Sequence, residues 1–370
     1  MPGYIRAAQI RLACPDLEGS LRFYTETLGF AVELVMPADA PSLAVVSAYG
    51  LTLRLESATA PAGAAASLHL LCDMKTLPGS LAHELTAPEG TRVLLVEAEP
   101  PVELPEMHQE FVLVRLGAQE AGAWGVGRAG MEYRDLIPGR LGGRFVASQI
   151  RIRDGGPVGD WVHYHRIRFQ MIYCLKGWVR LVYEDQGEPF ILHEGDCVLQ
   201  PPEIRHRVLE SSSGLEVIEI GCPAVHETYA DHAMTLPTDA LRLDRKFGGQ
   251  RFARHMAASA IWSPWRLDSF EARDTGIDAA TGGLASVRVV RPVAGRSSAE
   301  SVSHQGEFQF LFVLKGALVL EGRELGRHHL GAGDCCVIPA GAAHSIAAEP
   351  GLEFLDVTLP AELPLSRFSS

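Results

Sequence analysis

Residues 169–177 read FQMIYCLKG, and residues 308–316 read FQFLFVLKG. The two stretches carry the same residue at five of nine positions, and each is an apolar run closed by Lys and Gly. Around both copies, short apolar runs alternate with Gly and Pro turns. This pattern is typical of all-β barrels or sandwiches.

A second pair of motifs follows in the same order. GDCVLQP begins at Gly195 and leads to His206, and GDCCVIP begins at Gly333 and leads to His344. In both copies the histidine stands eleven positions after the glycine. Two motifs that recur in order at matched spacing indicate a duplicated domain. We therefore predict two β-barrels, over residues 144–237 and 284–362, joined by a bridging segment at 238–283.

The N-terminal third has a different pattern. At 370 residues the chain exceeds what one hydrophobic core usually organises. Residues 4–116 contain short alternating runs around a helix expected at 17–27, with Asp16 at its start and Gly29 at its end. A Gly-rich passage at 117–143 is predicted to be a linker. We expect a mixed α+β domain ahead of the two barrels.

Three histidines of the first repeat have the spacing of a metal site. His163 and His165 are two apart, so on a strand both side chains point to the same face. A second strand bearing His206 could complete a face of three imidazoles on a divalent metal ion. Such a face leaves coordination positions open for water, oxygen or a substrate.

These motifs resemble those of the cupin superfamily, in which HxH, Glu and Gly are followed by Gly, Pro and His. Gln170 stands where the family usually has Glu, and Glu203 stands where it usually has Gly. The resemblance implies a mainly β fold with two double-stranded β-helix (jelly-roll) barrels. It also implies that the three histidines, with Gln170, surround a metal ion.

Gln170 could act in two ways. Its amide oxygen could ligate the metal, or the amide could form hydrogen bonds in the layer behind the ligands. In either role, an amide in place of a carboxylate makes the site one unit more positive. We therefore expect an anionic or chelating small-molecule substrate, which Gln170 would help to orient.

The second repeat has a weaker ligand set. His304, Gln309 and His344 correspond to His165, Gln170 and His206, but Val302 stands in place of His163. Two imidazoles and a neutral amide bind divalent cations weakly. We expect this barrel to be structural or ligand-binding, and a metal site at His304, Gln309 and His344 is a minor hypothesis.

Residues 9–17, QIRLACPDL, and the following SLRFYTETLGF resemble the opening of the glyoxalase and bleomycin-resistance (vicinal oxygen chelate) proteins. The resemblance implies a βαβββ module, with a second module from residue 67 to about residue 93. It places Gln9 and His69 at metal-ligand positions and Glu56 near a third. Leu94 falls at the fourth position and cannot coordinate a metal, so we expect a degenerate site.

Composition excludes several classes of function. The formal net charge is −12, and without a basic run this argues against nucleic-acid binding. No apolar stretch approaches the length of a membrane span, and no signal peptide is recognisable, so a cytoplasmic location is expected. Most of the seven cysteines lie in apolar runs, which favours buried thiols in a reducing compartment.

The cupin resemblance implies an Fe(II) dioxygenase that acts on an enol, diketone, hydroxy acid or phenol, although Mn, Ni or Zn could also occupy the site. Two alternatives remain at this stage. The same histidines could serve a metal-dependent isomerase, epimerase or cyclase, or the barrels could bind a small ligand without catalysis. A homodimer is expected because both kinds of domain often dimerise.

Overall fold

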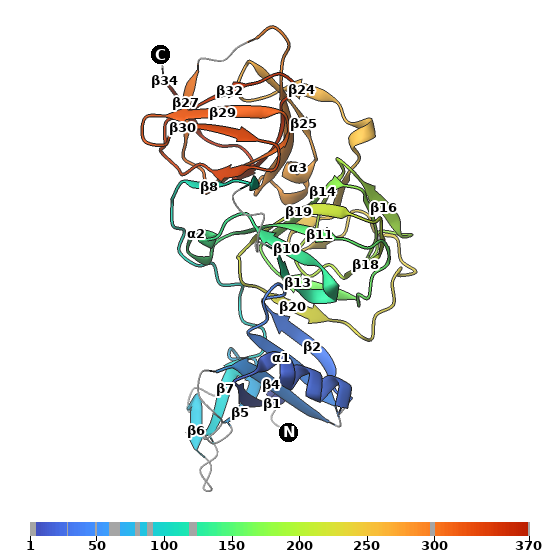
Figure 1. The fold of residues 1–370 in the computed structure, drawn as a ribbon. Coiled ribbons are helices and arrows are strands. Elements are labelled where there is room, and N and C mark those ends of the chain that lie inside the picture. The colour runs from blue at the N-terminus through green and yellow to red at the C-terminus, as the bar shows by residue number, and fades with distance from the viewer. Residues whose placement is uncertain are drawn as a thin grey trace. The chain divides into compact units, whose positions relative to one another are not determined.

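The computed structural model describes residues 5–27, 29–48, 50–58, 67–77, 82–86, 92–117, 124–296 and 300–368. The chain divides into two compact units. The first comprises residues 1–103 with 162–166 and 225–234, and the second comprises the remaining residues. The predicted fold class is confirmed, because a βαβββ module and two β-barrels account for nearly all elements (Figure 1).

The first unit opens with the expected βαβββ module. Its elements are β1 (Ile5–Cys14), α1 (Leu17–Arg22) with the π turn η1 (Phe23–Thr27), β2 (Ala31–Met36), β3 (Leu43–Ala48) and β4 (Leu51–Ser57). The helix begins where predicted, since the Asp16 carboxylate accepts a hydrogen bond from the Gly19 backbone N–H. Side chains of α1, β1, β3 and β4 enclose a small apolar core that includes Leu17, Val46 and Leu55.

The sheet of this unit continues on both sides of the module. On one side β1 pairs with β5 (Ser67–Cys72), which is followed by β7 (Arg92–Glu97) and β6 (Glu84–Thr86). Residues 87–91 of the expected second module lie outside the described residues. On the other side β2 pairs with β20 (Glu227–Ala230), and β20 pairs with β13 (His163–Arg166). β13 and β20 of the first cupin-like repeat therefore belong to the first unit and extend its sheet.

In the second unit, each repeat contributes one large sheet. The first follows the order β23-β17-β14-β19-β11-β10-β9. Its strands are β9 (Trp124–Val126), β10 (Glu132–Asp135), β11 (Val146–Ile152), β14 (Phe169–Lys176), β17 (Cys197–Leu199), β19 (Leu215–Cys222) and β23 (Ala253–His255). Smaller strands face it, namely β12 (Gly156–Pro157), β15 (Trp178–Tyr183), β16 (Phe190–His193) and β18 (His206–Ser211).

The second repeat has the matching order β24-β25-β26-β33-β28-β31-β8. Its strands are β8 (Val112–Val114), β24 (Trp262–Pro264), β25 (Phe270–Asp274), β26 (Ser286–Pro292), β28 (Phe308–Lys315), β31 (Cys335–Val337) and β33 (Glu353–Leu359). The other strands of this barrel are β27 (Ser301–His304), β29 (Ala317–Gly322), β30 (Gly326–Gly331), β32 (Ser345–Ala348) and β34 (Leu365–Phe368). Short elements β21 (Lys246–Phe247), β22 (Gln250–Arg251) and α3 (Ile277–Thr281) lie between the repeats.

The two barrels exchange edge strands. β8 precedes the first repeat but pairs with β31 of the second, whereas β23 precedes the second repeat but pairs with β17 of the first. β8 lies within residues 4–116, the range predicted for the N-terminal domain. The predicted linker contains β9 and β10 of the first large sheet, and the predicted bridging segment contains β23 of the first sheet and β24 and β25 of the second; residues 118–123 lie outside the described residues. These short strands carry too little apolar pattern to be recognised from sequence.

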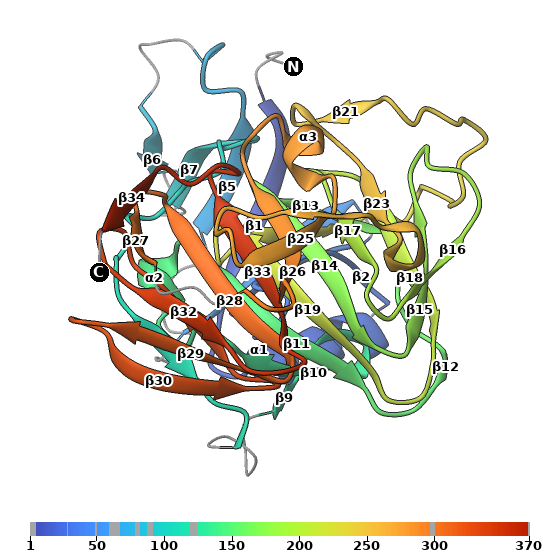
Figure 2. The same ribbon diagram turned by 90° about the horizontal axis from the view of Figure 1, so that it is seen from above.

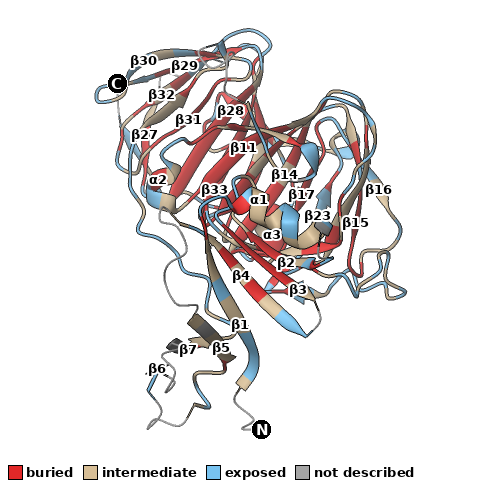
Figure 3. Ribbon diagram, turned by 60° about the horizontal axis from the view of Figure 1, so that its bottom comes forward, coloured by how far each residue is buried: buried red, intermediate tan, exposed pale blue. Residues whose placement is uncertain are grey.

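A common core joins the two large sheets. The rings of Phe145 and Phe308 stack with centroids 4.0 Å apart, and the cluster around them includes buried side chains of β11, β14, β19, β28 and β33. Figure 2 shows where these strands run, and Figure 3 shows buried residues along β11, β14, β28 and β33. Around this core, Glu307 accepts hydrogen bonds from Arg144 and Arg168. All seven cysteines are buried and unpaired, as the sequence predicts.

None of the described helices is long and apolar enough to cross a membrane.

Truncation of Phe145 should weaken the hydrophobic core that the two barrels share. The F145A variant removes a fully buried ring from the shared core, and we expect its free energy of unfolding to fall by about 3–5 kcal/mol. F368A is a matched control because Phe368 is 45% exposed, whereas Phe145 is fully buried. Chemical denaturation would measure both variants, and equal stabilities would contradict this account of the core.

Candidate metal centre

The three predicted histidines of the first repeat lie together. His163, His165 and His206 are all buried, and one nitrogen of each lies within 4.8 Å of those of the other two. Within the described part of the chain this is the one group of three or more His, Cys, Asp or Glu side chains with metal-binding spacing. The spacing fits a single divalent ion bound by three imidazoles.

β13 positions two of these imidazoles. His163 and His165 are two residues apart on the strand and their rings are nearly perpendicular, with centroids 5.2 Å apart. The Nδ1 atom of His165 lies 2.9 Å from the hydroxyl of Thr228, which stands opposite it on β20. If this Nδ1 carries the proton, it donates a hydrogen bond to the Thr228 hydroxyl oxygen, and the Nε2 lone pair is left for a metal.

His206 has its tautomer fixed by the backbone. Its Nδ1 lies 2.9 Å from the carbonyl oxygen of Ile204, which can only accept a hydrogen bond, so Nδ1 carries the proton. The lone pair is therefore on Nε2. The amide nitrogen of Gln200 lies 3.3 Å from this Nε2, so a metal ion and this N–H would compete for the same lone pair.

A chain of buried hydrogen bonds runs behind His206. The Gln170 amide donates to a Glu219 carboxylate oxygen at 2.6 Å, and the Gln170 amide oxygen accepts from Gln200 at 3.1 Å. The Gln200 amide oxygen accepts in turn from the Tyr183 hydroxyl at 2.8 Å. A carboxylate only accepts, so Glu219 fixes the orientation of both amides.

This network supports the second of the two roles expected for Gln170. Both ends of its amide already have partners, and one of them, Gln200, contacts the metal-facing nitrogen of His206. Burial raises the pKa of Tyr183 far above its ordinary value, so the phenol stays protonated and keeps donating. Gln170 thus helps to hold the ligand layer in place.

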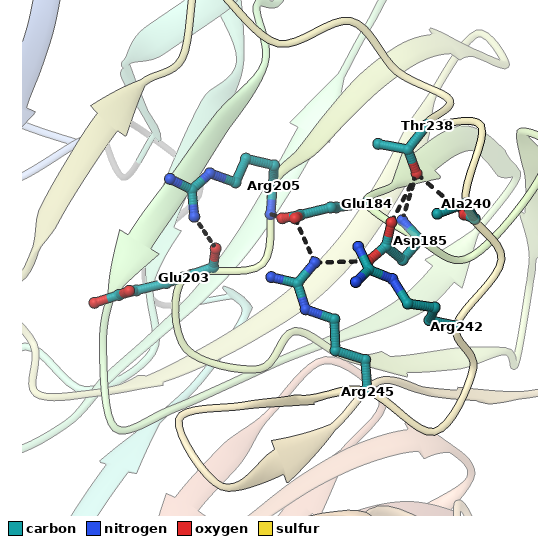
Figure 4. Close-up of polar contacts among 8 residues, drawn as sticks. All are labelled: Glu184, Asp185, Glu203, Arg205, Thr238, Ala240, Arg242 and Arg245. Carbon is teal, nitrogen blue, oxygen red and sulfur yellow. Dashed lines mark hydrogen bonds and ion pairs between the residues drawn. The ribbon is translucent and has the colours of Figure 1, made fainter.

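The loop before His206 is anchored by a second polar cluster. Backbone groups of Arg205 bond to Glu184, and Arg245 donates to the carboxylates of Glu184 and Asp185 at 2.6 Å each (Figure 4). Burial alone would raise the pKa of Asp185, but hydrogen bonds from Arg245 and Thr238 lower it overall. These contacts tie residues 238–245 to the turn that follows β15.

Glu203, in the same loop, has a backbone conformation that favours glycine. Its φ angle is +63°, and the equivalent residue of the second repeat, Gly341, has a φ of +83°. The family pattern with glycine at this position thus has a conformational reason. The first barrel tolerates a non-glycine residue there at a cost of about 1 kcal/mol.

Arg151 of β11 and Arg153, which follows the end of that strand, do not face the metal centre. Arg151 and Arg153 both pair with Glu132 of β10, and Arg151 also covers the ring of Trp124. Ile150, which alternates with them, is buried in a core cluster. The arginines thus form the more exposed face of this strand and do not offer a clamp for a substrate carboxylate.

In the second barrel, His304 uses both of its ring nitrogens for internal hydrogen bonds. His304 donates through Nε2 to the Ile338 carbonyl oxygen at 2.9 Å, while its Nδ1 accepts from the Gly306 N–H at 3.1 Å. Both nitrogens are occupied, so His304 has no lone pair left for a metal. The minor hypothesis of a site at His304, Gln309 and His344 is not supported by this geometry.

The supporting network is also missing from the second barrel. Ile338 stands at the position of Gln200, and the buried amide oxygen of Gln309 has no hydrogen-bond partner among the described residues. Asp356, at the position of Glu219, is bound by both terminal nitrogens of Arg266. The second repeat thus lacks both a metal ligand, at Val302, and the residues that orient the others.

In the N-terminal unit, the predicted ligand positions are close together, but the residues at them do not suit a metal ion. Gln9 and His69 are directly opposite each other on β1 and β5, and Leu94 is the neighbour of His69 on β7. Glu56 is bound by Arg11 and Arg54. Two cations bound to the one carboxylate among these four positions disfavour a divalent metal, in agreement with a degenerate site.

Sequence reasoning missed four residues of the first centre, namely Tyr183, Gln200, Glu219 and Thr228. They come from four separate segments and form no local motif. A comparison of the repeats could have found part of the signal, because Gln200 is replaced by Ile338 and Glu219 by Asp356 between otherwise similar stretches.

Family models agree with this architecture. The cupin domain model matches residues 150–221 and 288–358, and the model of the glyoxalase, bleomycin resistance protein and dioxygenase superfamily matches residues 6–113. The chain is therefore a bicupin of the cupin superfamily with an N-terminal glyoxalase domain. A search of curated proteins found no significant sequence match.

Solved structures with this fold include salicylate 1,2-dioxygenase from Pseudaminobacter salicylatoxidans. It is 13% identical with a TM-score of 0.53, and the match covers 72% of this chain and 90% of that chain. A variant of that enzyme in complex with gentisate is 15% identical with a TM-score of 0.54, covering 73% of this chain and 89% of the other. At such low identity the likeness establishes the fold and leaves the reaction open.

Exchange of the Gln170 and Glu219 side chains tests the hydrogen-bond network behind His206. In Q170E a second carboxylate would lie against Glu219, so we expect a loss of about 1–3 kcal/mol in the free energy of unfolding. The double variant Q170E/E219Q restores one carboxylate and one amide and should recover most of this loss. Chemical denaturation of metal-free protein measures both variants, and additive losses in the double variant would show that the two groups do not interact.

His344 should make the stability of the second barrel depend on pH. Burial lowers its pKa from 6.5 to about 4. Below pH 6.5, His344 binds a proton in the unfolded chain but stays neutral in the folded chain. The stability present above pH 6.5 is therefore lost as the pH falls towards 4. The contribution reaches about 3 kcal/mol, and the variant H344Q should lack it. Parallel unfolding curves for both proteins across this range would contradict the assignment.

Proposed function

We propose that the chain is a metal-dependent enzyme whose centre is formed by His163, His165 and His206, and that it is an Fe(II) dioxygenase of a small chelating substrate. The observation that carries the proposal is the buried triad itself. Its nitrogens share one small space, and the backbone directs the lone pair of His206 into it. The substrate class is an enol, diketone, hydroxy acid or phenol.

The residues present fit such an ion. Three neutral imidazoles are suitable ligands for Fe(II), and they leave adjacent positions open. When bound, the ion would supply Lewis acidity and redox chemistry towards a chelating substrate and O2. The imidazoles carry no charge to offset a dication, so the site favours substrates that bind as anions.

The chain's own residues define what surrounds the reaction. The low exposure of the three histidines limits access of bulk water. Gln170 and Gln200 are held in single orientations by Glu219 and Tyr183, so they present fixed dipoles to the ligand layer. Tyr183 remains a neutral phenol, which makes it an orienting hydrogen-bond donor and excludes it as a base at neutral pH.

The solved structures guide the choice of test compounds. A salicylate dioxygenase shares the fold, and a variant of it has been captured with gentisate. Both compounds carry a phenol next to a carboxylate and can chelate a metal as anions. They therefore belong in the first screen, beside diketones and aliphatic hydroxy acids.

The test begins with the metal content of protein purified without added metal or chelator. We expect about one equivalent of iron in the wild type and less than about a tenth of that in H163A and H206A. H193A is a matched control, because His193 is an exposed histidine of the same repeat. The proteins are then loaded with Fe(II), and O2 consumption is followed with each test compound.

Each outcome decides between the alternatives. Oxygen uptake that depends on substrate and on His206 supports the dioxygenase. Turnover without oxygen, or with Mn, Ni or Zn, moves the assignment to an isomerase, epimerase or cyclase. If the wild type neither contains metal nor binds it on reconstitution, the proposed centre is wrong and the barrels are ligand-binding modules.

A further inference from the structure

One face of the N-terminal sheet gathers charged side chains from three neighbouring strands. Ile10 and Leu12 of β1 and Leu53 and Leu55 of β4 contribute to the core beneath helix α1. Side chains alternate along a strand, so the residues between them lie on the opposite face. On that face are Gln9, Arg11, Arg54, Glu56 and, from β5, His69.

The two arginines are oriented by one carboxylate. The Nε atom of Arg11 donates to one oxygen of Glu56, and the Nε atom of Arg54 donates to the other, each at 2.5 Å. Hydrogen bonds from both guanidinium groups lower the pKa of Glu56, although its burial alone would raise it. The carboxylate therefore stays charged and holds both guanidinium groups beside it.

These contacts leave donors unused. In the part of the chain that the structure describes, neither Arg11 nor Arg54 makes a hydrogen bond through its terminal Nη atoms. The Nε2 atom of His69 is buried and also has no hydrogen-bond partner there. Buried polar atoms without partners usually mark a position that is completed by water or a ligand.

The balance of charge decides which ligand fits. Arg11 and Arg54 contribute two positive charges and Glu56 one negative charge, so the group is cationic even with His69 neutral. The nearest residue on β7 beside His69 is the apolar Leu94. A metal cation would be repelled, whereas a small anion would meet two guanidinium forks with geometry suited to its oxygens.

We propose that this face of the glyoxalase domain binds a small oxyanion, a carboxylate or a phosphate, between the Nη groups of Arg11 and Arg54 with His69 alongside. The site is separate from the histidine centre and does not depend on the proposed function. Glu56 repels the anion but aligns the arginines, so the net attraction is moderate.

Calorimetric titration of the full-length protein tests the proposal, with inorganic phosphate and succinate as separate probes. We expect saturable binding of one anion per chain to the wild type. R11Q and R54Q should each weaken it at least about tenfold, because each removes charge-assisted hydrogen bonds. Binding of phosphate alone identifies a phosphoryl ligand, and binding of succinate alone identifies a carboxylate.

Two control variants separate this site from others. R22Q removes an arginine of the same domain that is exposed and paired only loosely with Glu18, so it should bind the probes like the wild type. H206A should also bind normally, which distinguishes this site from the metal centre. Circular dichroism confirms that each variant is folded. Absence of saturable binding to the wild type, or equal affinities in R11Q, R54Q and wild type, would overturn the proposal.

Discussion

A carboxylate can accept hydrogen bonds but cannot donate them, and at Glu219 this limitation sets the direction of every hydrogen bond behind His206. The amide of Gln170 must turn its nitrogen towards Glu219, which directs its oxygen to Gln200. Gln200 must then direct its oxygen to Tyr183 and its nitrogen towards His206. One acidic side chain thereby determines that an amide N–H faces the Nε2 lone pair of His206, although two residues lie between them, while the Ile204 carbonyl places that lone pair.

The two barrels show which features a duplicated domain keeps and which it loses. Both retain the strands around Phe169 and Phe308, because these strands supply the core shared by the repeats. The residues at the metal-site positions of the second barrel do not contribute to this shared core, and their contacts differ from those of the first. There Asp356 is bound by Arg266, and both ring nitrogens of His304 form hydrogen bonds with backbone groups. The amide oxygen of Gln309 has no hydrogen-bond partner in the part of the chain that the structure describes.

Local patterns explain how far the sequence could predict this structure. The repeat, the helix after Asp16 and the grouping of His163, His165 and His206 all follow from residues close together in the chain or at known motif spacing. The support behind His206 does not, because its members come from separate strands and are ordinary residue types. The exchange of β8 and β23 was also hidden, since strands of three residues carry almost no periodic signal.

The pairing of β2 with β20 has a consequence for the order in which the chain is made. β2 ends at Met36, but its partner is not complete until Ala230. During synthesis the N-terminal sheet therefore presents an open edge while nearly two hundred further residues are added. The glyoxalase domain is synthesised before the cupin repeats, yet its sheet can gain the partner of β2 only after most of the first cupin repeat has followed it.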